Sequence, residues 1–199
     1  MSKPRKLSNQ ELRTRKDLLQ AATRLLKQGR KPSMEEVAKE ALVSRATAYR
    51  CFRNVDALLA EAPVDDATRP LDTLFDQNTS TDPEARIDEA EAALHDIVFK
   101  NEAQLRMMLA HTTSRALDKD PSGPKRQNRR GPLIEAALAP ARQRFRDKDY
   151  EKLCAALALI FGTESMIVFR DVLNLDEKTA RQVKSWAVRA LVRAALKPA

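Results

Sequence analysis

Glycine and aromatic residues are both scarce in this 199-residue chain, which has 4 glycines and 5% aromatic residues. All-β folds need glycine at many tight turns and aromatic side chains across their sheets. With few of these and with 43% hydrophobic residues, the composition favours an all-helical fold. A chain of this length has room for one large core, or for a small domain beside a larger one.

Long apolar runs and clustered cysteines are also absent. No stretch approaches the roughly 18 apolar residues that a membrane-spanning helix requires, and the basic residues Lys3, Arg5 and Lys6 precede no apolar segment. Cys51 and Cys154 stand far apart, without a CxxC motif, so neither a zinc site nor a disulfide framework is indicated. We therefore expect a cytoplasmic protein without a metal or other cofactor, in which both cysteines are buried thiols.

Charge is distributed unevenly along the chain. Residues 1–53 hold 14 Lys and Arg against 5 Asp and Glu, whereas residues 54–199 hold 22 against 23. The net charge of +8 therefore comes from the first quarter of the sequence. A basic segment joined to a neutral one suggests that the first part binds a polyanion such as nucleic acid; the alternative is a solvated basic face. We expect two domains, residues 1–53 and residues 54–199.

Three short helices are predicted before residue 53. Ser8 and Ser33 each precede a glutamate by three positions, a capping-box pattern that starts a helix. Ser44 is the expected N-cap of the third helix, which runs through Phe52. Helical spacing predicts these inward positions: Leu18, Leu19, Ala22, Leu25 and Leu26 in the first helix, Met34, Val37, Ala38 and Ala41 in the second, and Ala48, Cys51 and Phe52 in the third.

The rest of the chain also has a helical pattern. Asn54 can cap a helix that Pro63 and Pro70 kink or split, and Asp82-Pro83 starts another that continues to Phe99. The basic stretch 125–130 is expected to be a loop, either solvated or in contact with DNA or an anionic ligand. Further helices are predicted at 101–118 and at about 132–146, 149–173 and 176–196, which gives about nine in total.

Residues 33–52 meet the physical requirements of a helix-turn-helix. Two short helices must cross closely, and Ala38 supplies a small residue for that crossing. Apolar residues must pin the turn and the back of the second helix, and Val37, Val43 and Phe52 are spaced to do so. The outward face then presents Arg45, Ala46, Tyr49 and Arg50, with Thr47 beside them.

This face suits contact with duplex DNA. We expect Arg45 to read base edges, with Thr47 beside it and with Ala46 against a thymine methyl. Phosphate contacts are expected from the remaining polar positions. The predicted DNA-binding residues are Ser33, Ser44, Arg45, Ala46, Thr47, Tyr49 and Arg50.

Over about residues 12–60 the sequence resembles the DNA-binding domain of the TetR family of transcriptional regulators. The resemblance rests on Ser33–Ala38, Val43–Phe52, Asn54–Leu59 and the Ala21-Ala22 pair. It implies a homodimer that binds a palindromic operator, usually a repressor released by a small-molecule effector in a larger helical C-terminal domain. It also implies that the helices at about 149–173 and 176–196 form the dimer interface.

Three positions depart from the family pattern. Leu42 stands in the turn where the family usually has glycine, so a non-glycine residue must adopt an unfavourable backbone conformation or the turn must shift. Cys51 and Val55 replace residues that often contact phosphate in the family. The basic residues Lys3, Arg5, Lys6, Arg13, Arg15 and Lys16 are expected to compensate by following the DNA backbone or minor groove, or residues 1–7 form a disordered tail.

An effector pocket needs a few polar groups among apolar ones. Candidates are His111, Thr112 and Thr113, and the stretch from Ile160 to Met166 that contains Phe161 and Glu164. Glu164 is expected either to pair with a cationic ligand or to form an ion pair with Arg115 or Arg170. His95 and His111 are the two histidines, and each is either a sensing residue or an ordinary surface or interior histidine.

The predicted final helix carries a long apolar face rich in small residues. Together with the stripe of the preceding helix, this surface is larger than one partner helix would cover, which favours dimerisation. The face comprises Val183, Trp186, Ala187, Ala190, Leu191 and Ala194, and the preceding stripe comprises Leu157, Ile160, Phe161, Ile167 and Val168.

Two other classes of function compete with a DNA-binding regulator. An enzyme needs a nucleophile with its base, a paired carboxylate site or spaced metal ligands, and the sequence shows none of these patterns. A helical interaction module, whose basic end binds RNA or an acidic partner and which has no effector, is the other alternative. Few aromatic residues accompany the basic positions, which argues against the base stacking that single-strand recognition uses.

Overall fold

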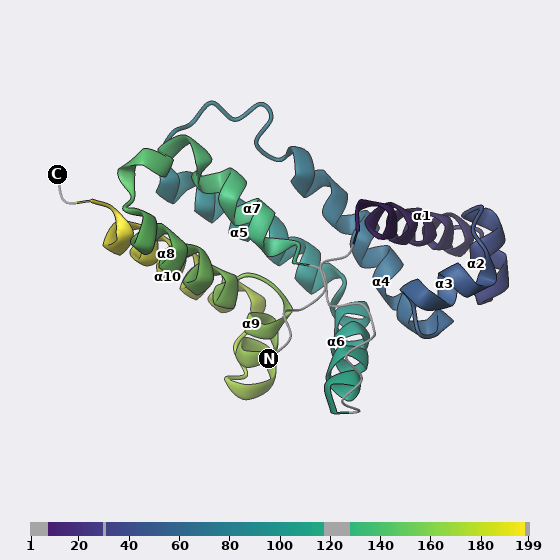
Figure 1. Cartoon of the computed structure of the whole chain (residues 1–199). Helices are drawn as coiled ribbons and strands as arrows, with labels where there is room; N and C mark the ends of the chain where they lie inside the picture. The colour runs from purple at the N-terminus through teal and green to yellow at the C-terminus, as the bar shows by residue number, and fades with distance from the viewer. Residues whose placement is uncertain (1–7, 30, 118–127, 198–199) are drawn as a thin grey trace. The chain divides into compact units, whose positions relative to one another are not determined.

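The computed structural model describes residues 8–29, 31–117 and 128–197, and the fold within these ranges is all-helical, as predicted. The α-helices are α1 (Asn9–Leu26), α2 (Met34–Glu40), α3 (Arg45–Cys51), α4 (Val55–Thr68), α5 (Pro83–Lys100), α6 (Glu102–Leu117), α7 (Arg130–Leu138), α8 (Asp147–Ile160), α9 (Thr163–Ile167) and α10 (Glu177–Ala195) (Figure 1). Two 3₁₀ segments follow α4 and α7, at Arg69–Thr73 and Ala139–Arg144, and a π-helical turn, Val168–Val172, follows α9.

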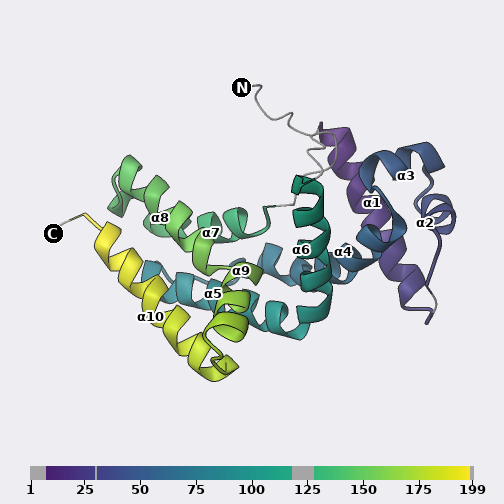
Figure 2. The ribbon, with the colours of Figure 1, turned by 90° about the horizontal axis from the view of Figure 1, so that it is seen from below.

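The helices form two compact units. The first contains α1 to α4 and most of α6, and the second contains α5 and α7 to α10. In the second unit α5 packs against α7 and α10, and α8 packs against the same two helices (Figures 1 and 2). Helix α4 contributes Leu58 and Ala62 to the core of the first unit. The domain boundary after residue 53 stays a prediction.

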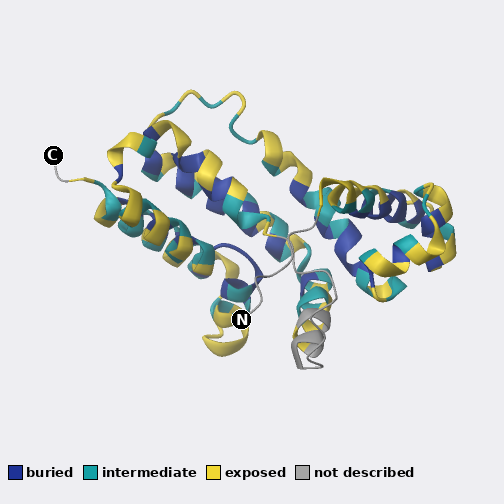
Figure 3. Ribbon diagram, in the orientation of Figure 1, coloured by how far each residue is buried: buried dark blue, intermediate teal, exposed yellow. Residues whose placement is uncertain are grey.

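Serine caps start the first three helices. The Ser8 and Ser33 hydroxyls each accept a hydrogen bond from the glutamate amide three residues on, and both predicted capping boxes are complete. Ser44 caps α3 in the same way through the Thr47 amide. The buried faces of these helices then form one core (Figure 3), whose largest members are Leu18, Leu19, Leu25, Met34, Phe52 and Leu58.

The turn between α2 and α3 depends on a left-handed residue. Leu42 has a φ of +57° and its side chain is 93% exposed. The Val43 amide donates to the Ala38 carbonyl and the Leu42 amide to the Lys39 carbonyl, which is the hydrogen-bond pattern of a Schellman motif. The turn therefore keeps the geometry that normally uses glycine, although leucine occupies the position.

Three predicted helices differ in the structure. The one predicted at about 132–146 is an α-helix only to Leu138 and continues as the 3₁₀ segment Ala139–Arg144. Helix α4 is not split at Pro63 but continues to Thr68, and the backbone changes to a 3₁₀ segment at Pro70. The predicted helix at 149–173 is wrong as one element, because the chain breaks at Gly162 and the two parts bend by 47°. Gly162 has a φ of +105°, and a Cβ there would meet the Arg130 guanidinium at 3.1 Å. This break raises the number of α-helices in the described ranges above the nine predicted.

Several residues expected to be buried are only half-buried or exposed. Cys51 and Cys154 are free thiols that are half-buried. On α10 the buried face consists of Ala180, Lys184, Val188 and Val192, and the apolar face predicted from the sequence lies outside it. From the preceding stripe, Leu157 and Phe161 are buried within the chain itself and leave no surface for a partner.

Within the described ranges no single helix is long and apolar enough to cross a membrane. Only the bent pair Asp147–Ile160 and Thr163–Val172 reaches that length and composition when its two parts are taken together.

Candidate nucleic-acid interface

Helix α3 has one face in the core and one face in solvent. Ala48 and Phe52 are buried, whereas Arg45, Ala46 and Arg50 are exposed. Tyr49 is 42% exposed, and Thr47 is half-buried beside them. The structure thus brings the predicted side chains of α3 together on one largely exposed face of the helix.

The serines and Thr47 are engaged in capping. Ser33 accepts from the Glu36 amide at 3.2 Å, and Ser44 accepts from the Thr47 amide at 3.1 Å. The hydroxyls of Ser44 and Thr47 also lie 2.8 Å apart, within hydrogen-bond distance. Both caps are exposed at helix N-termini, where amides and the helix dipole favour a negatively charged partner.

The Arg45 guanidinium is held by a residue that the sequence did not single out. Its Nε lies 2.8 Å from a carboxylate oxygen of Glu35 on α2, and its Cζ lies 5.5 Å from the centre of the Tyr49 ring. A contact through Nε leaves the two terminal nitrogens to form the fork that matches guanine O6 and N7. Glu35 was missed because the sequence does not show which residues of α2 and α3 face each other across the turn.

Arg15 is not a DNA-facing residue, contrary to the prediction. It is 5% exposed, and its Nη1 donates to the Cys51 carbonyl at 2.9 Å. Its Nη2 forms an ion pair with Glu61 of α4, and its Cζ lies 4.0 Å above the Phe52 ring. The spacing contained a signal for this burial, because Arg15 precedes Leu18 and Leu19 by three and four positions on the same helical face.

The other basic residues near the N-terminus, which were also expected to contact DNA, fall into two groups. Arg13 and Lys16 are exposed on α1 and remain compatible with a DNA contact. Lys3, Arg5 and Lys6 lie outside the described residues, as do residues 125–127 of the predicted basic loop. Val55 and Cys51 are both half-buried, and burial raises the pKa of the Cys51 thiol.

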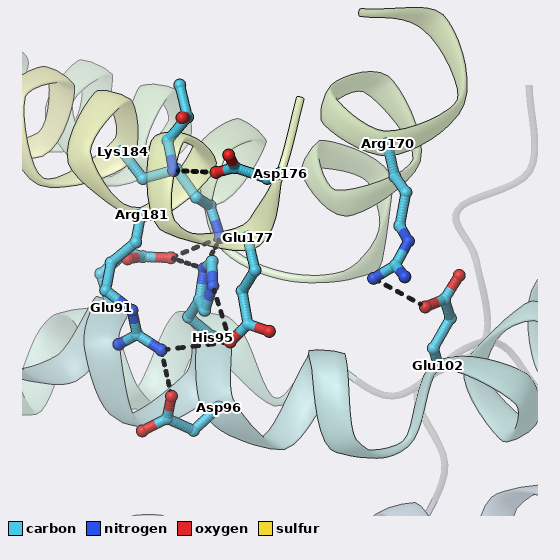
Figure 4. A network of polar contacts seen from close by, with 10 residues as sticks. Glu91, His95, Asp96, Glu102, Arg170, Asp176, Glu177, Arg181 and Lys184 are labelled. Atoms are coloured by element: carbon cyan, nitrogen blue, oxygen red, sulfur yellow. Dashed lines mark hydrogen bonds and ion pairs between the residues drawn. The ribbon is translucent and has the colours of Figure 1, made fainter. Parts of the chain in front are cut away.

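A buried polar cluster joins α5 to α10 in the second unit (Figure 4). Lys184 forms an ion pair with Glu91, and the Lys184 Nζ lies 3.4 Å from Nδ1 of His95; all three side chains are at most 2% exposed. The His95 ring stacks on Phe99 with centres 4.3 Å apart. From the sequence His95 was either a sensing residue or an ordinary histidine, and its partners Glu91 and Lys184 could not be predicted.

Burial controls the protonation of this cluster. It lowers the pKa of His95 to about 4, an effect that the Lys184 and Arg181 charges increase. It also raises the pKa of Glu91 and lowers that of Lys184, because desolvation outweighs the attraction between the two groups. His95 is therefore neutral near pH 7. On either side of the cluster, α5 carboxylates pair with α10 arginines, as Glu84–Arg193, Asp88–Arg189 and Asp96–Arg181.

Two of the predicted effector residues, Phe161 and Glu164, have described side chains. Glu164 pairs with Arg130 at 2.7 Å, and Arg170 pairs with Glu102 (Figure 4), whereas the side chain of Arg115 lies outside the described residues. Phe161 is buried. The side chains of His111 and Thr112 lie outside the described residues. In the described part of the chain, no group of three or more His, Cys, Asp or Glu side chains could hold a metal ion.

Comparison with known proteins agrees with the geometry of the first unit. The family model described as "Bacterial regulatory proteins, tetR family" matches residues 18–62, from within α1 to within α4. No curated protein and no solved structure matches the chain. The match confirms the resemblance predicted from the sequence and covers the helices that present α3 to solvent. Residues 18–62 therefore form a DNA-binding domain of the tetR family of bacterial regulatory proteins, which identifies the protein as a DNA-binding transcriptional regulator.

Proposed function

We propose that the protein is a homodimeric repressor that reads a palindromic operator with α3 and is released by a small molecule bound in its second unit. The observation that carries the DNA-reading part is the exposed face of α3, opposite Ala48 and Phe52 in the core. Two arginines, a tyrosine and a small alanine on that face supply the contacts that a major groove accepts.

Each residue of the face has a proposed role. Arg45, braced by Glu35, donates through its terminal nitrogens to a guanine, and Ala46 contacts a thymine methyl. Thr47 lies beside them. Phosphate contacts come from Tyr49 and Arg50 and from the exposed N-caps Ser33 and Ser44.

The test starts from duplexes that the wild-type protein selects from a random-sequence library. We expect Arg45→Ala to weaken binding to a selected duplex by about 10- to 100-fold, because one bidentate base contact is worth roughly 1–3 kcal/mol. Binding to a scrambled duplex of the same composition should change much less. Affinities are measured by fluorescence anisotropy at a fixed salt concentration.

Arg24→Ala is the matched control for this experiment. Arg24 is also an exposed arginine paired with a glutamate, Glu40, at 2.7 Å, but it lies on α1. It should leave the ratio of selected to scrambled affinity unchanged. If the wild-type protein binds both duplexes equally, the proposed operator recognition is wrong. That result would instead favour a helical module that binds nucleic acid without sequence preference.

Exposed apolar side chains in the second unit support the homodimer. Leu159 of α8 is 77% exposed and Trp186 of α10 is 73% exposed, values that are unusual for such large apolar residues. Val168, Val172, Leu173 and Val183 of the same unit are also exposed. A second copy that covers α8 and α10 would remove this surface from water and present two copies of α3 to two half-sites.

The proposal of effector release is based on the resemblance to the tetR family and on the helical second unit, which would hold the effector. The proposed pocket residues in the second unit are Phe161 and Glu164. Because the Glu164 carboxylate is already paired with Arg130, a cationic effector would have to displace that guanidinium. A small molecule that raises the thermal midpoint of the protein and releases a selected duplex would meet this expectation, and higher expression from an operator-linked reporter on its addition would identify repression.

A further inference from the structure

A single buried guanidinium connects three helices of the first unit. Arg15 of α1 donates to the carbonyl of Cys51, the last residue of α3, and pairs with Glu61 of α4. Its planar face lies on the Phe52 ring, with Cζ 4.0 Å from the ring centre. The side chains of Arg15 and Glu61 are 6% and 10% exposed, so water screens their charges little.

A buried ion pair is a poor way to gain stability alone. Removing two charges from water costs several kcal/mol per ion, and a pair of apolar residues of similar size often serves as well. What the pair supplies is a fixed geometry, because a guanidinium donates in a rigid planar fork. Lysine keeps the charge but cannot bond two acceptors in this plane and also stack on the ring.

The geometry matters because α3 has few other constraints. It has seven residues, and Ala48 is the one buried residue within it. The carbonyls of its last turn lack partners inside the helix, and Arg15 supplies a donor to one of them. The Ser44 cap holds the other end of the helix. The Arg15 contact therefore constrains the C-terminal end of a helix whose exposed face carries Arg45 and Arg50.

We propose that Arg15 is a positioning residue for DNA recognition, which together with Glu61 sets the tilt of α3. In this role Arg15 is buried, does not contact DNA and acts through the Cys51 carbonyl and the Phe52 ring. This inference rests on the proposed reading of DNA by α3. It replaces the role expected from the sequence, in which Arg15 followed the DNA backbone directly.

The test uses the full-length protein with the selected and scrambled duplexes. Arg15→Lys keeps the charge and removes the two-acceptor geometry, and Glu61→Gln keeps an acceptor and removes the charge. We expect Arg15→Lys to weaken binding to the selected duplex by about tenfold, or roughly 1.4 kcal/mol, because a displaced α3 loses part of its base contacts. Binding to the scrambled duplex should change by less than about twofold, because the phosphate-contacting charges remain.

Three further measurements separate positioning from general support of the core. The double variant should lose no more affinity for the selected duplex than the weaker-binding single variant, because both changes break the same link. Amide hydrogen exchange should accelerate in residues 45–52 and not in residues 18–25 of α1. Arg24 lies on α1, like Arg15, and forms an exposed pair with Glu40 of α2. Arg24→Lys should therefore change neither the affinities nor the exchange rates.

Each result decides between the two proposals. All binding is measured well below the thermal midpoint of each variant, and Glu61→Gln provides the test if Arg15→Lys does not fold. Positioning by Arg15 is overturned if Arg15→Lys lowers the thermal midpoint and leaves the ratio of selected to scrambled affinity as in the wild type. It is also overturned if both affinities fall equally. Failure of the wild type to prefer the selected duplex would instead overturn the proposed function.

Discussion

Among the described residues, Leu42 has the backbone conformation that suits its side chain least, a left-handed φ of +57°. A left-handed conformation places Cβ close to the following carbonyl, which costs an L-residue roughly 1–2 kcal/mol. The Schellman hydrogen bonds to Ala38 and Lys39 maintain the turn in spite of that cost. Because the side chain is almost fully exposed, no buried contact offsets the strain. The helix-turn-helix thus contains a small local destabilisation at its centre.

We therefore expect Leu42→Gly to raise the free energy of unfolding by about 0.5–1 kcal/mol. Glycine relieves the left-handed strain, and its greater freedom in the unfolded chain takes back part of the gain. Urea denaturation followed by circular dichroism measures the difference. Leu42→Ala is the control, because it removes the exposed side chain and keeps Cβ, so it should show no gain. A glycine variant no more stable than the alanine variant would exclude strain at this position.

At the scale of helices, local sequence signals predicted where the first three helices begin, but they did not predict where the helix at 149–173 is interrupted. Ser8, Ser33 and Ser44 predicted the starts of α1, α2 and α3, because a cap acts on amides within three residues of itself. The break at Gly162 was missed because apolar positions continue at helical spacing on both sides of it. Its cause is tertiary, since the Arg130 guanidinium from α7 occupies the space beside this glycine.

In the candidate site, too, features within one helix could be predicted and contacts between helices could not. The exposed face of α3 could be predicted, because helical periodicity assigns each residue of one helix to a side. The contacts Arg45–Glu35, Arg15–Glu61 and Lys184–Glu91 could not, because each joins two helices whose relative register is set by the whole core. The sequence pattern shows which residues are charged but not which of them form ion pairs.

The buried Glu91–Lys184 pair between α5 and α10 gives a prediction for these two helices. We expect Lys184→Met to lower the free energy of unfolding by about 3 kcal/mol, because it leaves the Glu91 carboxyl buried without its cation. Adding Glu91→Leu should recover most of the loss, because an apolar pair of similar volume needs no charge partner. Urea denaturation of both variants measures this recovery.

The exposed Arg193–Glu84 pair between the same helices is the matched control. Arg193→Gln should leave the urea midpoint unchanged, since solvent and salt screen an exposed pair. A double variant less stable than Lys184→Met alone would show that the polar groups themselves, with His95, hold α5 against α10.

At the scale of the whole molecule, the exposed apolar surface of the second unit is the feature that a single chain leaves unexplained. Trp186 and Leu159 stand on α10 and α8, the helices that the family places at its dimer interface. A regulator that reads a palindrome needs both copies of α3, so the oligomeric state and DNA affinity are linked. Weakening the dimer should therefore weaken operator binding without any change at α3.

We expect Trp186→Arg to weaken the dimer on the order of 100-fold, because it removes a large apolar anchor and adds a charge that dimerisation would bury. Sedimentation equilibrium should then show monomer at concentrations where the wild type is dimeric. Binding to a selected palindromic duplex should weaken, whereas binding to a duplex with one half-site should stay close to that of the wild type.

Met107→Arg is the matched control. Met107 is an apolar residue of α6 that is 51% exposed, and this variant should remain dimeric. If Trp186→Arg remains dimeric and binds the palindrome as tightly as the wild type, the dimer interface lies elsewhere. In that case the apolar surface of α8 and α10 would serve another contact, because its exposure would still need a partner.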